Sequence, residues 1–399
     1  MALILTRSPY FISKKNYDPF ASLTLEIGVV QFDVSNVSSL RVLETYTLNF
    51  RNRTHLDVSQ LIHGVEDNLY TYLSAEGAYF AEQFSIYNLT IKFTIDGTIN
   101  DVVSQDVFTN TALRGYTFST EPQNYNPADY LSDNGYYAGS SDVLYKLDDS
   151  NLEFPLINPN SDSDPYQDLN LDNYCTVTSY LKGEIINQQN IYFNMSAINQ
   201  TFSTDTYASF KERVEADGGV LYETGCLTDF FDCHKLVDID KVTIAPSDGS
   251  KVKIIEIRTI EECKYNPYRI SFRNRFGVWE HLWFFKKSTK SISVDADEYR
   301  QNQFKARSAG LLTRTSVEYN KNGVDSITVN SGFVDERMNE SFRQLMLSEE
   351  VLAYDFKENL KFSVRVSNSE LKMKTSVNDK LINYTIDLEM SNKIIDDIV

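Results

Sequence analysis

The amino-acid sequence predicts a mainly β protein, built from two β-sandwich-like domains with a few short helices and a long acidic, Tyr- and Asn-rich arm or insertion. Two observations favour this fold class. The 399 residues include 25 Tyr and 24 Phe, and aromatic side chains are enriched in strands. Many short runs alternate apolar and polar residues, which is the period of a half-buried strand. With 42% hydrophobic and 24% charged residues, the chain has the composition of a folded protein.

The first predicted domain, residues 1–118, contains three strand patterns. Leu23, Leu25 and Ile27 alternate with polar residues, and the run 40–50 is rich in β-branched and aromatic residues. A third run over 84–95 leads into Asp96-Gly97 and then into 98–103. Because Asp-Gly is typical of two-residue hairpin turns, we expect a β-hairpin with its turn at Asp96-Gly97.

One helix is predicted inside this domain. Apolar residues recur there at four-residue spacing, which places them on one face of a helix. These residues are Leu61, Val65, Leu69 and Leu73. Asp57 or Ser59 is available as the N-cap.

Residues 119–174 break the strand pattern. They are crowded with Asn, Asp, Ser, Pro and Tyr. A stretch of this length without secondary structure is uncommon inside a compact domain, and its aromatic content is too high for a free linker. We predict that residues 119–174 form an extended acidic arm or insertion that becomes ordered on a neighbouring molecule.

Residues 175–262 are predicted to form an intermediate segment that completes or bridges the two domains. Strand patterns occur over 190–198, 241–245 and 251–260, the last two on either side of Ser247-Asp248-Gly249. Residues 206–218 are predicted to hold a short helix that ends at Gly218-Gly219.

The second predicted domain comprises residues 263–399. Alternation over 268–272 leads into a tight turn at 274–277, and heavy residues on both faces of 278–285 predict a strand that is covered on both sides. Asn322-Gly323 predicts a second hairpin, between strands at 313–319 and 324–329. A helix is expected over 335–347, and two final strands over 360–366 and 382–390.

The charge balance excludes one class of function. The chain has 38 basic and 56 acidic residues and a net charge of −18, of which residues 1–200 contribute −14. Since Lys and Arg drive sequence-independent binding to nucleic acids, we exclude direct DNA or RNA binding. No apolar run approaches the roughly 18 residues of a membrane span, and the apolar stretch at residues 2–5 is too short for a secretory signal. We expect assembly in a cytoplasm and no membrane partner.

Cysteine and histidine supply one candidate metal site. Its members are Cys226, Cys233, His234 and Cys263. Their spacing does not match the close ligand pairs of structural zinc sites. Buried thiols beside an ordinary histidine are the favoured interpretation, and zinc is the alternative.

Aspartates supply a second candidate metal site at Asp162, Asp164 and Asp168, followed by Asn170 and Asp172. An EF-hand loop beginning at Asp162 requires Gly at its sixth position and Glu at its twelfth. Gln167 and Asn173 stand there instead. A solvated acidic loop is therefore favoured, with a calcium site of another kind as the alternative.

No motif locates a reaction centre. The sequence contains no G-x-G-x-x-G, Walker A, H-E-x-x-H or G-x-S-x-G motif. The histidines are scattered along the chain, at His55, His63, His234 and His281. We predict no enzymatic activity, no catalytic or cofactor-binding residue and no cofactor.

The C-terminal residues resemble a family of virion proteins. The block Cys263-Lys264-Tyr265-Asn266-Pro267-Tyr268 and the run ISFRNRFGVWEHLWFFKKS at 270–288 are similar to a pattern in tail, baseplate and neck structural proteins of tailed phages that infect Bacteroidetes, crAss-like phages included. TVNSG at 328–332, LMLSEEV at 345–351 and NDKLINYTIDLEM at 378–390 resemble the same pattern. The likeness covers about the last 140 residues well and about the first 120 loosely, mainly through RSPYFI at 7–12.

The resemblance implies a structural component of a tailed-phage virion. It implies a tail hub, baseplate or neck subunit that assembles as a symmetric ring around the DNA channel and has no active site. Its implied partners are copies of itself and other tail, portal or neck proteins, and its implied location is the virion tail. Since each contact in a ring joins two different patches, we predict that the 119–174 arm is one of them. We also predict that the acidic first half faces the channel, where it would repel DNA.

A receptor- or glycan-binding virion protein is the alternative function. In that case, exposed aromatic residues of the arm would stack on sugars. Fibre-like adhesins usually carry Gly-rich repeats or coiled-coil heptads, which this sequence lacks. The sequence therefore favours the ring.

Overall fold

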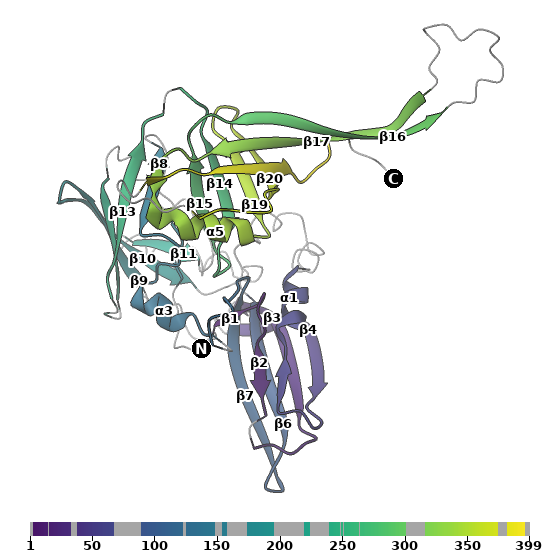
Figure 1. Cartoon of the computed structure of the whole chain (residues 1–399). Helices are drawn as coiled ribbons and strands as arrows, with labels where there is room; N and C mark the ends of the chain where they lie inside the picture. The colour runs from purple at the N-terminus through teal and green to yellow at the C-terminus, as the bar shows by residue number, and fades with distance from the viewer. Residues whose placement is uncertain are drawn as a thin grey trace. The chain divides into compact units, whose positions relative to one another are not determined.

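The structure is a computed structural model. It describes residues 3–14, 16–32, 38–67, 89–122, 125–147, 154–157, 174–194, 219–223, 239–247, 249, 251–262, 264–300, 316–373 and 381–395. Several β-sheets and a few short helices make up these residues, which confirms the predicted mainly β fold (Figure 1). The chain divides into two compact units: Met1–Glu261 with Arg273–His281, and Glu262–Phe272 with Leu282–Val399.

The first unit begins with a five-stranded sheet in the order β1-β7-β6-β3-β4. Its strands are β1 (Leu3–Leu5), β3 (Ser22–Phe32), β4 (Ser38–Asn49), β6 (Leu89–Ile99) and β7 (Val102–Leu113). β1 runs parallel to β7, and the other neighbours are antiparallel. The alternation predicted for Leu23, Leu25 and Ile27 places all three side chains in the core.

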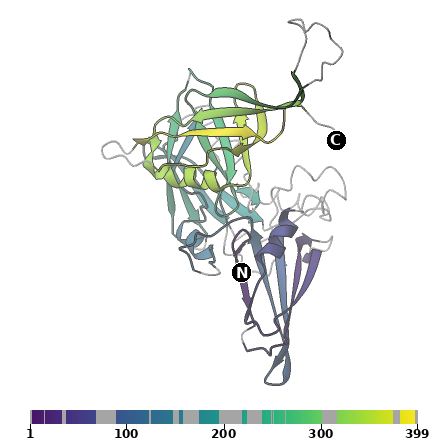
Figure 2. The same ribbon diagram turned by 45° about the vertical axis from the view of Figure 1, so that its right-hand side comes forward.

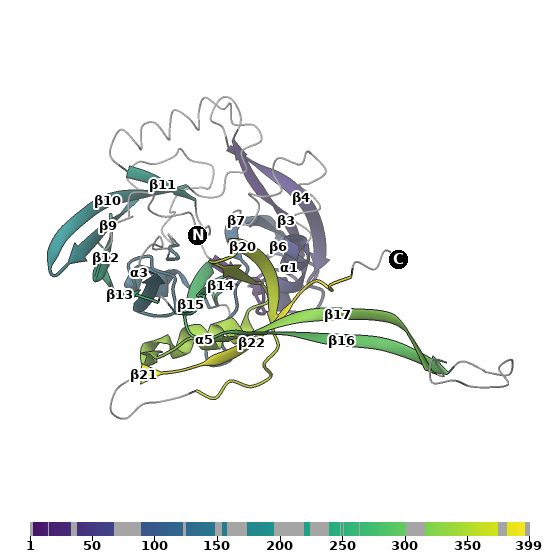
Figure 3. The ribbon, with the colours of Figure 1, turned by 90° about the horizontal axis from the view of Figure 1, so that it is seen from above.

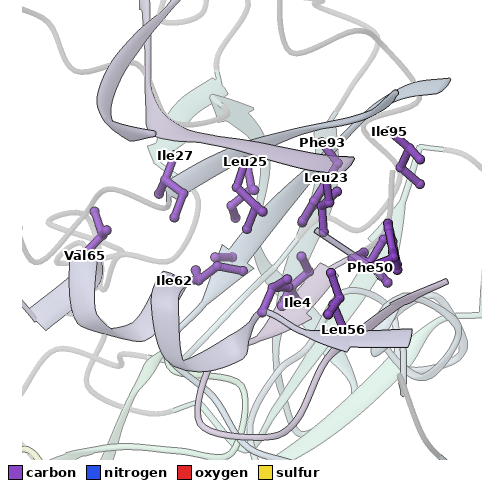
Figure 4. Close-up of a cluster of buried hydrophobic side chains, with 14 of the residues drawn as sticks. Ile4, Leu23, Leu25, Ile27, Phe50, Leu56, Ile62, Val65, Phe93 and Ile95 are labelled. Atoms are coloured by element: carbon purple, nitrogen blue, oxygen red, sulfur yellow. The ribbon is translucent and has the colours of Figure 1, made fainter. Parts of the chain in front are cut away.

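A second layer covers the core face of this sheet. It consists of the two-stranded sheet of β2 (Phe11–Ser13) and β5 (His55–Asp57), and of α1 (Ser59–Asp67). Ile62 and Val65 of α1 lie in the same apolar cluster as Leu25 and Ile27 (Figure 4). Two layers around one apolar interior satisfy the need of an amphipathic sheet to bury one face.

The start of α1 agrees with the sequence. The Asp57 carboxylate accepts hydrogen bonds from the Ser59 amide at 3.0 Å and from the Ser59 hydroxyl at 2.8 Å. This contact satisfies one of the amide groups that a helix leaves unpaired at its N-terminus. Leu69 and Leu73, which were expected to continue the helix, lie outside the described residues.

The predicted turn at Asp96-Gly97 is wrong, because both residues belong to β6. The hairpin turns instead at Asn100-Asp101, with φ angles of +51° and +64°. Asn and Asp are the non-glycine residues that most readily adopt this left-handed conformation. Gly97 is needed for a close approach, since a Cβ there would lie 2.9 Å from both the Ala21 Cβ and the Tyr17 ring.

The first unit also contains a six-stranded sheet, in the order β11-β10-β9-β12-β13-β8. The strands are β8 (Val143–Leu147), β9 (Tyr174–Leu181), β10 (Glu184–Asn194), β11 (Gly219–Glu223), β12 (Lys241–Pro246) and β13 (Lys253–Ile260). β12 and β13 confirm the strands predicted over 241–260, whereas β10 begins before the predicted residue 190. The helix predicted over 206–218 lies outside the described residues.

The prediction of an extended arm is wrong for the described part of residues 119–174. This part contains a short helix, α3 (Ala128–Asp133), and the edge strand β8. Tyr136, Tyr137 and Phe154 are fully buried in the core of their own unit. The aromatic content that suggested docking on a neighbour therefore reflects burial within the chain. Residues 158–173 lie outside the described residues.

The turn at 274–277 is confirmed, and it lies in the core of the first unit. Phe276 and Val278 join an apolar cluster with Leu3, Leu113 and Ile157. The Tyr116 amide donates to the Arg275 carbonyl at 2.8 Å. Two glycines allow the backbones to approach this closely. A Cβ on Gly115 would collide with the Arg275 carbonyl, and one on Gly277, whose φ is +78°, would lie 2.6 Å from the Arg114 backbone.

Arg275 fills an aromatic enclosure in the same turn. Its guanidinium lies 2.5 Å from a Glu121 carboxylate oxygen, and the two side chains are only 14% and 18% exposed. Four rings surround the guanidinium at 4.8–5.9 Å, those of Phe118, Tyr125, Tyr130 and Phe276. Stacking of aromatic rings on a guanidinium stabilises its charge when the group is buried away from solvent.

The second unit contains most of a seven-stranded sheet, whose order is β15-β14-β19-β20-β22-β17-β16. Figure 2 shows the green and yellow strands of this unit from a second side. The strands are β14 (Tyr268–Arg273), β15 (Trp279–Phe284), β16 (Thr289–Arg300), β17 (Ser316–Asn330), β19 (Val351–Asp355), β20 (Leu360–Val366) and β22 (Thr385–Met390). The predicted helix is present as the 3₁₀ turn η3 (Glu336–Met338) and α5 (Asn339–Leu347). β18 (Val334–Asp335) and β21 (Leu381–Ile382) form a separate pair.

The hairpin predicted at Asn322-Gly323 is also wrong. β17 runs straight through these residues and pairs along its length with β16, a strand that was not predicted. The register shifts by one residue between Asp295 and Asp297 of β16, opposite Asn320, whose φ is +48°. A left-handed residue at a β-bulge is therefore the local irregularity in this part of the chain.

Candidate assembly surface

The most exposed feature of the second unit is a two-stranded ribbon. We define the ribbon as β16 (Thr289–Arg300) with residues 316–325 of β17. β17 pairs with β22 only from Ser326 to Asn330, and β16 is the last strand of the sheet. Figure 3 shows the ribbon extending beyond the other strands of its sheet. An isolated two-stranded ribbon is at best marginally stable in water, so a partner surface would stabilise this one.

The two faces of the ribbon differ in polarity. Ile292 and Val294 lie on one face and are 58% and 50% exposed. They continue the face of β17 that buries Ile327, because Lys290 lies opposite Ile327 and every second residue shares a face. The other face of β16 carries polar side chains over most of its length, namely Thr289, Ser291, Ser293, Asp295 and Asp297.

Peptide groups of β16 point to the open edge of the sheet. In an antiparallel pair, successive residues direct their N–H and C=O groups to alternate sides. The Gly323 carbonyl accepts from the Ile394 amide at 2.8 Å, on the side away from β16. Gly323 lies opposite Val294. Val294 and Ile292 therefore direct their peptide groups away from β17, to the edge of the sheet.

The C-terminal segment covers part of the apolar face. The Ile395 amide donates to the Asn322 side-chain oxygen at 3.1 Å, and the Asn322 amide group donates to the Ile395 carbonyl at 2.9 Å. A Cβ built on Gly323 would lie 3.2 Å from the Ile394 side chain and 3.3 Å from that of Ile292. Ile394 and Ile292 thus flank Gly323, and both remain about half exposed.

A buried carboxylate lies at the base of the ribbon. Asp355 accepts hydrogen bonds from Asn266 at 2.7 Å and from the Tyr268 hydroxyl at 2.8 Å. The Lys290 ammonium lies 3.6 Å from Asp355 and 3.4 Å from Glu358. Burial alone would raise the pKa of Asp355, but the hydrogen bonds from Asn266, Tyr268 and the Glu358 amide, with the Lys290 charge, hold that pKa below its usual value. These contacts favour the ionised form of Asp355.

Charged and aromatic side chains occupy the far end of the ribbon. Tyr299 and Tyr319 make an edge-to-face contact with ring centroids 5.6 Å apart. Glu318 lies opposite Glu298, and Lys321 contacts Glu318 at 2.7 Å. The hydrogen bond from Lys321 lowers the pKa of Glu318. Lys321 therefore offsets the repulsion between two carboxylates that face each other across the strands.

A second buried carboxylate, Glu280, also has hydrogen-bond partners within its own unit. It accepts from the Ser140 amide at 3.1 Å, from the Ser140 hydroxyl at 2.5 Å and from Asn274 at 3.2 Å. Asn274 in turn donates to the Ala138 carbonyl at 2.7 Å. This network connects the buried turn at 274–277 to residues 138–140 of the same unit.

All of the candidate metal ligands fall outside the part of the chain that the structure describes. Cys226, Cys233, His234, Cys263, Asp162, Asp164 and Asp168 lie outside the described residues. Within the described ranges, no three His, Cys, Asp or Glu side chains are grouped so as to hold a metal ion.

The remaining titratable candidates occupy separate places. His55 is exposed and contacts the Thr54 hydroxyl at 2.8 Å, whereas His63 and His281 are half-buried in α1 and β15. The Cys175 thiol is buried and free, and burial raises its pKa. Among the described helices, none has the length and apolar composition to cross a membrane.

The ribbon is the feature that the sequence interpretation missed. Its signal is present, since Ser291 to Asp297 reads as a strict alternation of small or charged residues with Ile292, Val294 and Ala296. The Asn322-Gly323 pair obscured this signal, because it suggested a turn within the partner strand. Comparisons with protein-family models and with curated proteins find no match to this chain.

Proposed function

We propose that this chain is a structural component of a tailed-phage virion, a tail hub, baseplate or neck ring subunit that assembles with copies of itself around the DNA channel. The virion class rests on the resemblance of residues 263–288, 328–332, 345–351 and 378–390 to tail structural proteins. Assembly into a ring rests on the same resemblance together with the exposed ribbon.

The ribbon carries the assembly part of the proposal. Ile292 and Val294 are at least half exposed on β16, whose outer side no other strand of the described residues flanks. Exposed apolar patches mark interaction sites, and permanent assemblies bury about 2,000 Å² or more of largely apolar surface. A subunit interface accounts for both the composition and the length of the ribbon.

The glycan-binding alternative loses part of its support. It relied on exposed aromatic residues within 119–174, but Tyr136 and Tyr137 are buried. Tyr125 and Tyr130 surround the guanidinium of Arg275. Both rings pack on that cation within their own unit, although Tyr130 remains 37% exposed. A glycan-binding protein is therefore kept as an outcome of the experiment below.

The experiment is to purify the full chain, measure its mass by light scattering and average its particles by electron microscopy, in parallel with a glycan-binding assay. We expect closed rings of one copy number and no glycan binding. Gold-labelled antibody against the chain is expected to mark the tail of the phage particle. A monomer that binds glycan would replace the proposal with the alternative, and an unlabelled particle would remove the virion assignment.

A further inference from the structure

Lys253 of β13 lies in a mostly buried polar site of the first unit. Its side chain is only 15% exposed, and lysine is rarely buried unless it is paired. The Lys253 ammonium lies 2.5 Å from an Asp142 carboxylate oxygen and donates to the Asn134 side-chain oxygen at 3.0 Å. The buried Tyr137 ring has its centroid 5.7 Å from the same ammonium. An amine, a carboxylate and a carboxamide therefore meet at one place in the fold.

The backbone holds these three groups together. A Cβ built on Gly135 would lie 2.9 Å from the Lys253 backbone nitrogen, so the turn after α3 packs directly on β13. The Asp142 carbonyl accepts from the Glu256 amide of β13 at 2.8 Å. Asn134 and Asp142 are thus both held against the strand that carries Lys253. Groups fixed at such distances react far faster than the same groups free in solution.

We propose that the Lys253 amine attacks the side-chain carbonyl carbon of Asn134 and forms an isopeptide bond within the chain. The Nζ–Cγ bond forms, the Cγ–Nδ2 bond breaks, and the amide nitrogen leaves as ammonia. The two side chains supply every atom, so no oxidant, reductant or cofactor is required. The bond links residues 119 positions apart and fastens the turn after α3 to the six-stranded sheet. It does not depend on assembly into a ring.

Asp142 supplies the proton transfer that this reaction requires. An ammonium is not a nucleophile, so Lys253 must lose a proton before it attacks. The Asp142 carboxylate contacts that nitrogen and accepts the proton as a general base. It then donates the proton to the departing nitrogen of Asn134, which leaves as NH3. The new amide nitrogen releases a second proton to water, and the positive charge of the lysine is lost from the chain.

The two ends of the Asn134 amide group face opposite environments. Its oxygen accepts from the partly buried Lys253 ammonium. Its nitrogen donates to the Tyr130 carbonyl at 2.9 Å in an exposed contact. The amine therefore approaches from the buried side, and ammonia leaves to solvent. Escape of ammonia into water makes the bond permanent.

Peptide mapping of the full-length chain by mass spectrometry tests the bond. Trypsin cleaves after lysine and arginine, but not after an acylated lysine. The bond therefore joins peptide 115–146, which contains Asn134, to peptide 252–258, in which Lys253 stays uncleaved. The internal control is Lys251, whose side chain contacts Asp133 and is 73% exposed, and which should be cleaved completely. The intact chain should be lighter than its sequence by one ammonia.

Three variants test the role of each group. Lys253→Arg keeps the positive charge but has no primary amine, so it should have the mass of its sequence and give no joined peptides. Asp142→Asn should form the bond at least about 100-fold more slowly, because a positioned base contributes that much or more. Lys251→Arg is the matched control two residues away, and it should form the bond as completely as the wild type.

The same maps contain the results that would overturn the inference. Complete cleavage after Lys253 in the wild-type chain would show that the bond is absent. Loss of ammonia without joined peptides would instead indicate a succinimide, formed when the Gly135 amide nitrogen attacks Asn134. Equal rates in the wild type and in Asp142→Asn would overturn the role of Asp142 as the base.

Discussion

Two pairs of neighbouring strands in the same sheet lie in opposite environments. The turn between β14 and β15 is buried, with its arginine enclosed by four rings and its glycines against backbone. The ribbon of β16 and β17 is exposed on nearly every residue of β16. The difference teaches that pairing alone does not decide how much a hairpin contributes to stability; the layer that covers it does.

The comparison predicts that stability is concentrated in the buried turn and that association is concentrated in the ribbon. Substitutions in the turn should therefore lower the free energy of unfolding, and those in the ribbon should change assembly. The following tests run from the largest expected effect on stability to the smallest.

Gly277→Ala should have the largest effect. The new Cβ would lie 2.6 Å from the Arg114 backbone, at a φ of +78°. We expect a loss of more than about 3 kcal/mol in the free energy of unfolding, because left-handed strain and overpacking add. Urea denaturation measures it. The matched control is Gly183→Ala, where φ is +89° and no atom lies within 4 Å, so about 1 kcal/mol is expected there. Equal losses would show that backbone contact is unimportant in the turn.

Arg275→Ala should cost about 3 kcal/mol, because it leaves the largely buried Glu121 carboxylate without its cation. Arg275→Lys should recover only part of this loss, since an ammonium lacks the planar face that stacks on rings. Arg365→Ala is the control. Arg365 contacts Glu389 at 2.9 Å but is 69% exposed, and such pairs contribute less than about 1 kcal/mol. If both arginines behaved alike in thermal unfolding, the enclosure would not be a stabilising element.

Asp355→Asn should reduce the dependence of stability on acid. The folded pKa of Asp355 lies below its ordinary value. Its ionisation therefore stabilises the fold above the ordinary pKa of about 3.9, and this contribution is lost as the pH falls through the folded pKa. Between about pH 5 and pH 2, the free energy of unfolding should decrease less steeply with falling pH in the variant than in the wild type. Parallel curves would mean that Asp355 does not contribute.

Ile292→Ala should have the smallest effect on folding. The side chain is mostly exposed, so a change within about 0.5 kcal/mol is expected, together with weaker assembly by light scattering. Ile327→Ala is the matched control on the same face of the sheet, where the side chain is buried, and it should cost about 2–5 kcal/mol. A large loss at Ile292 would show that the ribbon is covered within its own chain.

Several elements could be predicted from the sequence because they depend on local periodicity. The alternation of Leu23, Leu25 and Ile27 gives one buried face in β3. In the predicted C-terminal helix, Met338 of η3 and Phe342 and Leu345 of α5 are buried on one face. These patterns predict the elements correctly because an element that buries one face needs apolar residues at the period of a strand or a helix.

The two incorrect turns share a cause. Asp96-Gly97 and Asn322-Gly323 both lie inside strands, where the glycine admits a neighbouring group: Ala21 and Tyr17 at Gly97, and Ile394 at Gly323. A glycine within a strand indicates close approach as well as a turn, and the approaching residue is remote in sequence. The enclosure of Arg275 was unpredictable for the same reason, since its partners other than Phe276 come from residues 118–130.

Residues 273–281 belong to the unit that otherwise ends at Glu261, and this division has a consequence for folding during synthesis. Phe276 and Val278 complete an apolar cluster that begins at Leu3. The ribosome must therefore deliver some 280 residues before that cluster can close, which takes roughly 15–60 s at bacterial elongation rates. Throughout that interval the leucines at the start of the chain remain incompletely covered. Nascent chains stalled before residue 273 should thus be the forms most readily captured by chaperones.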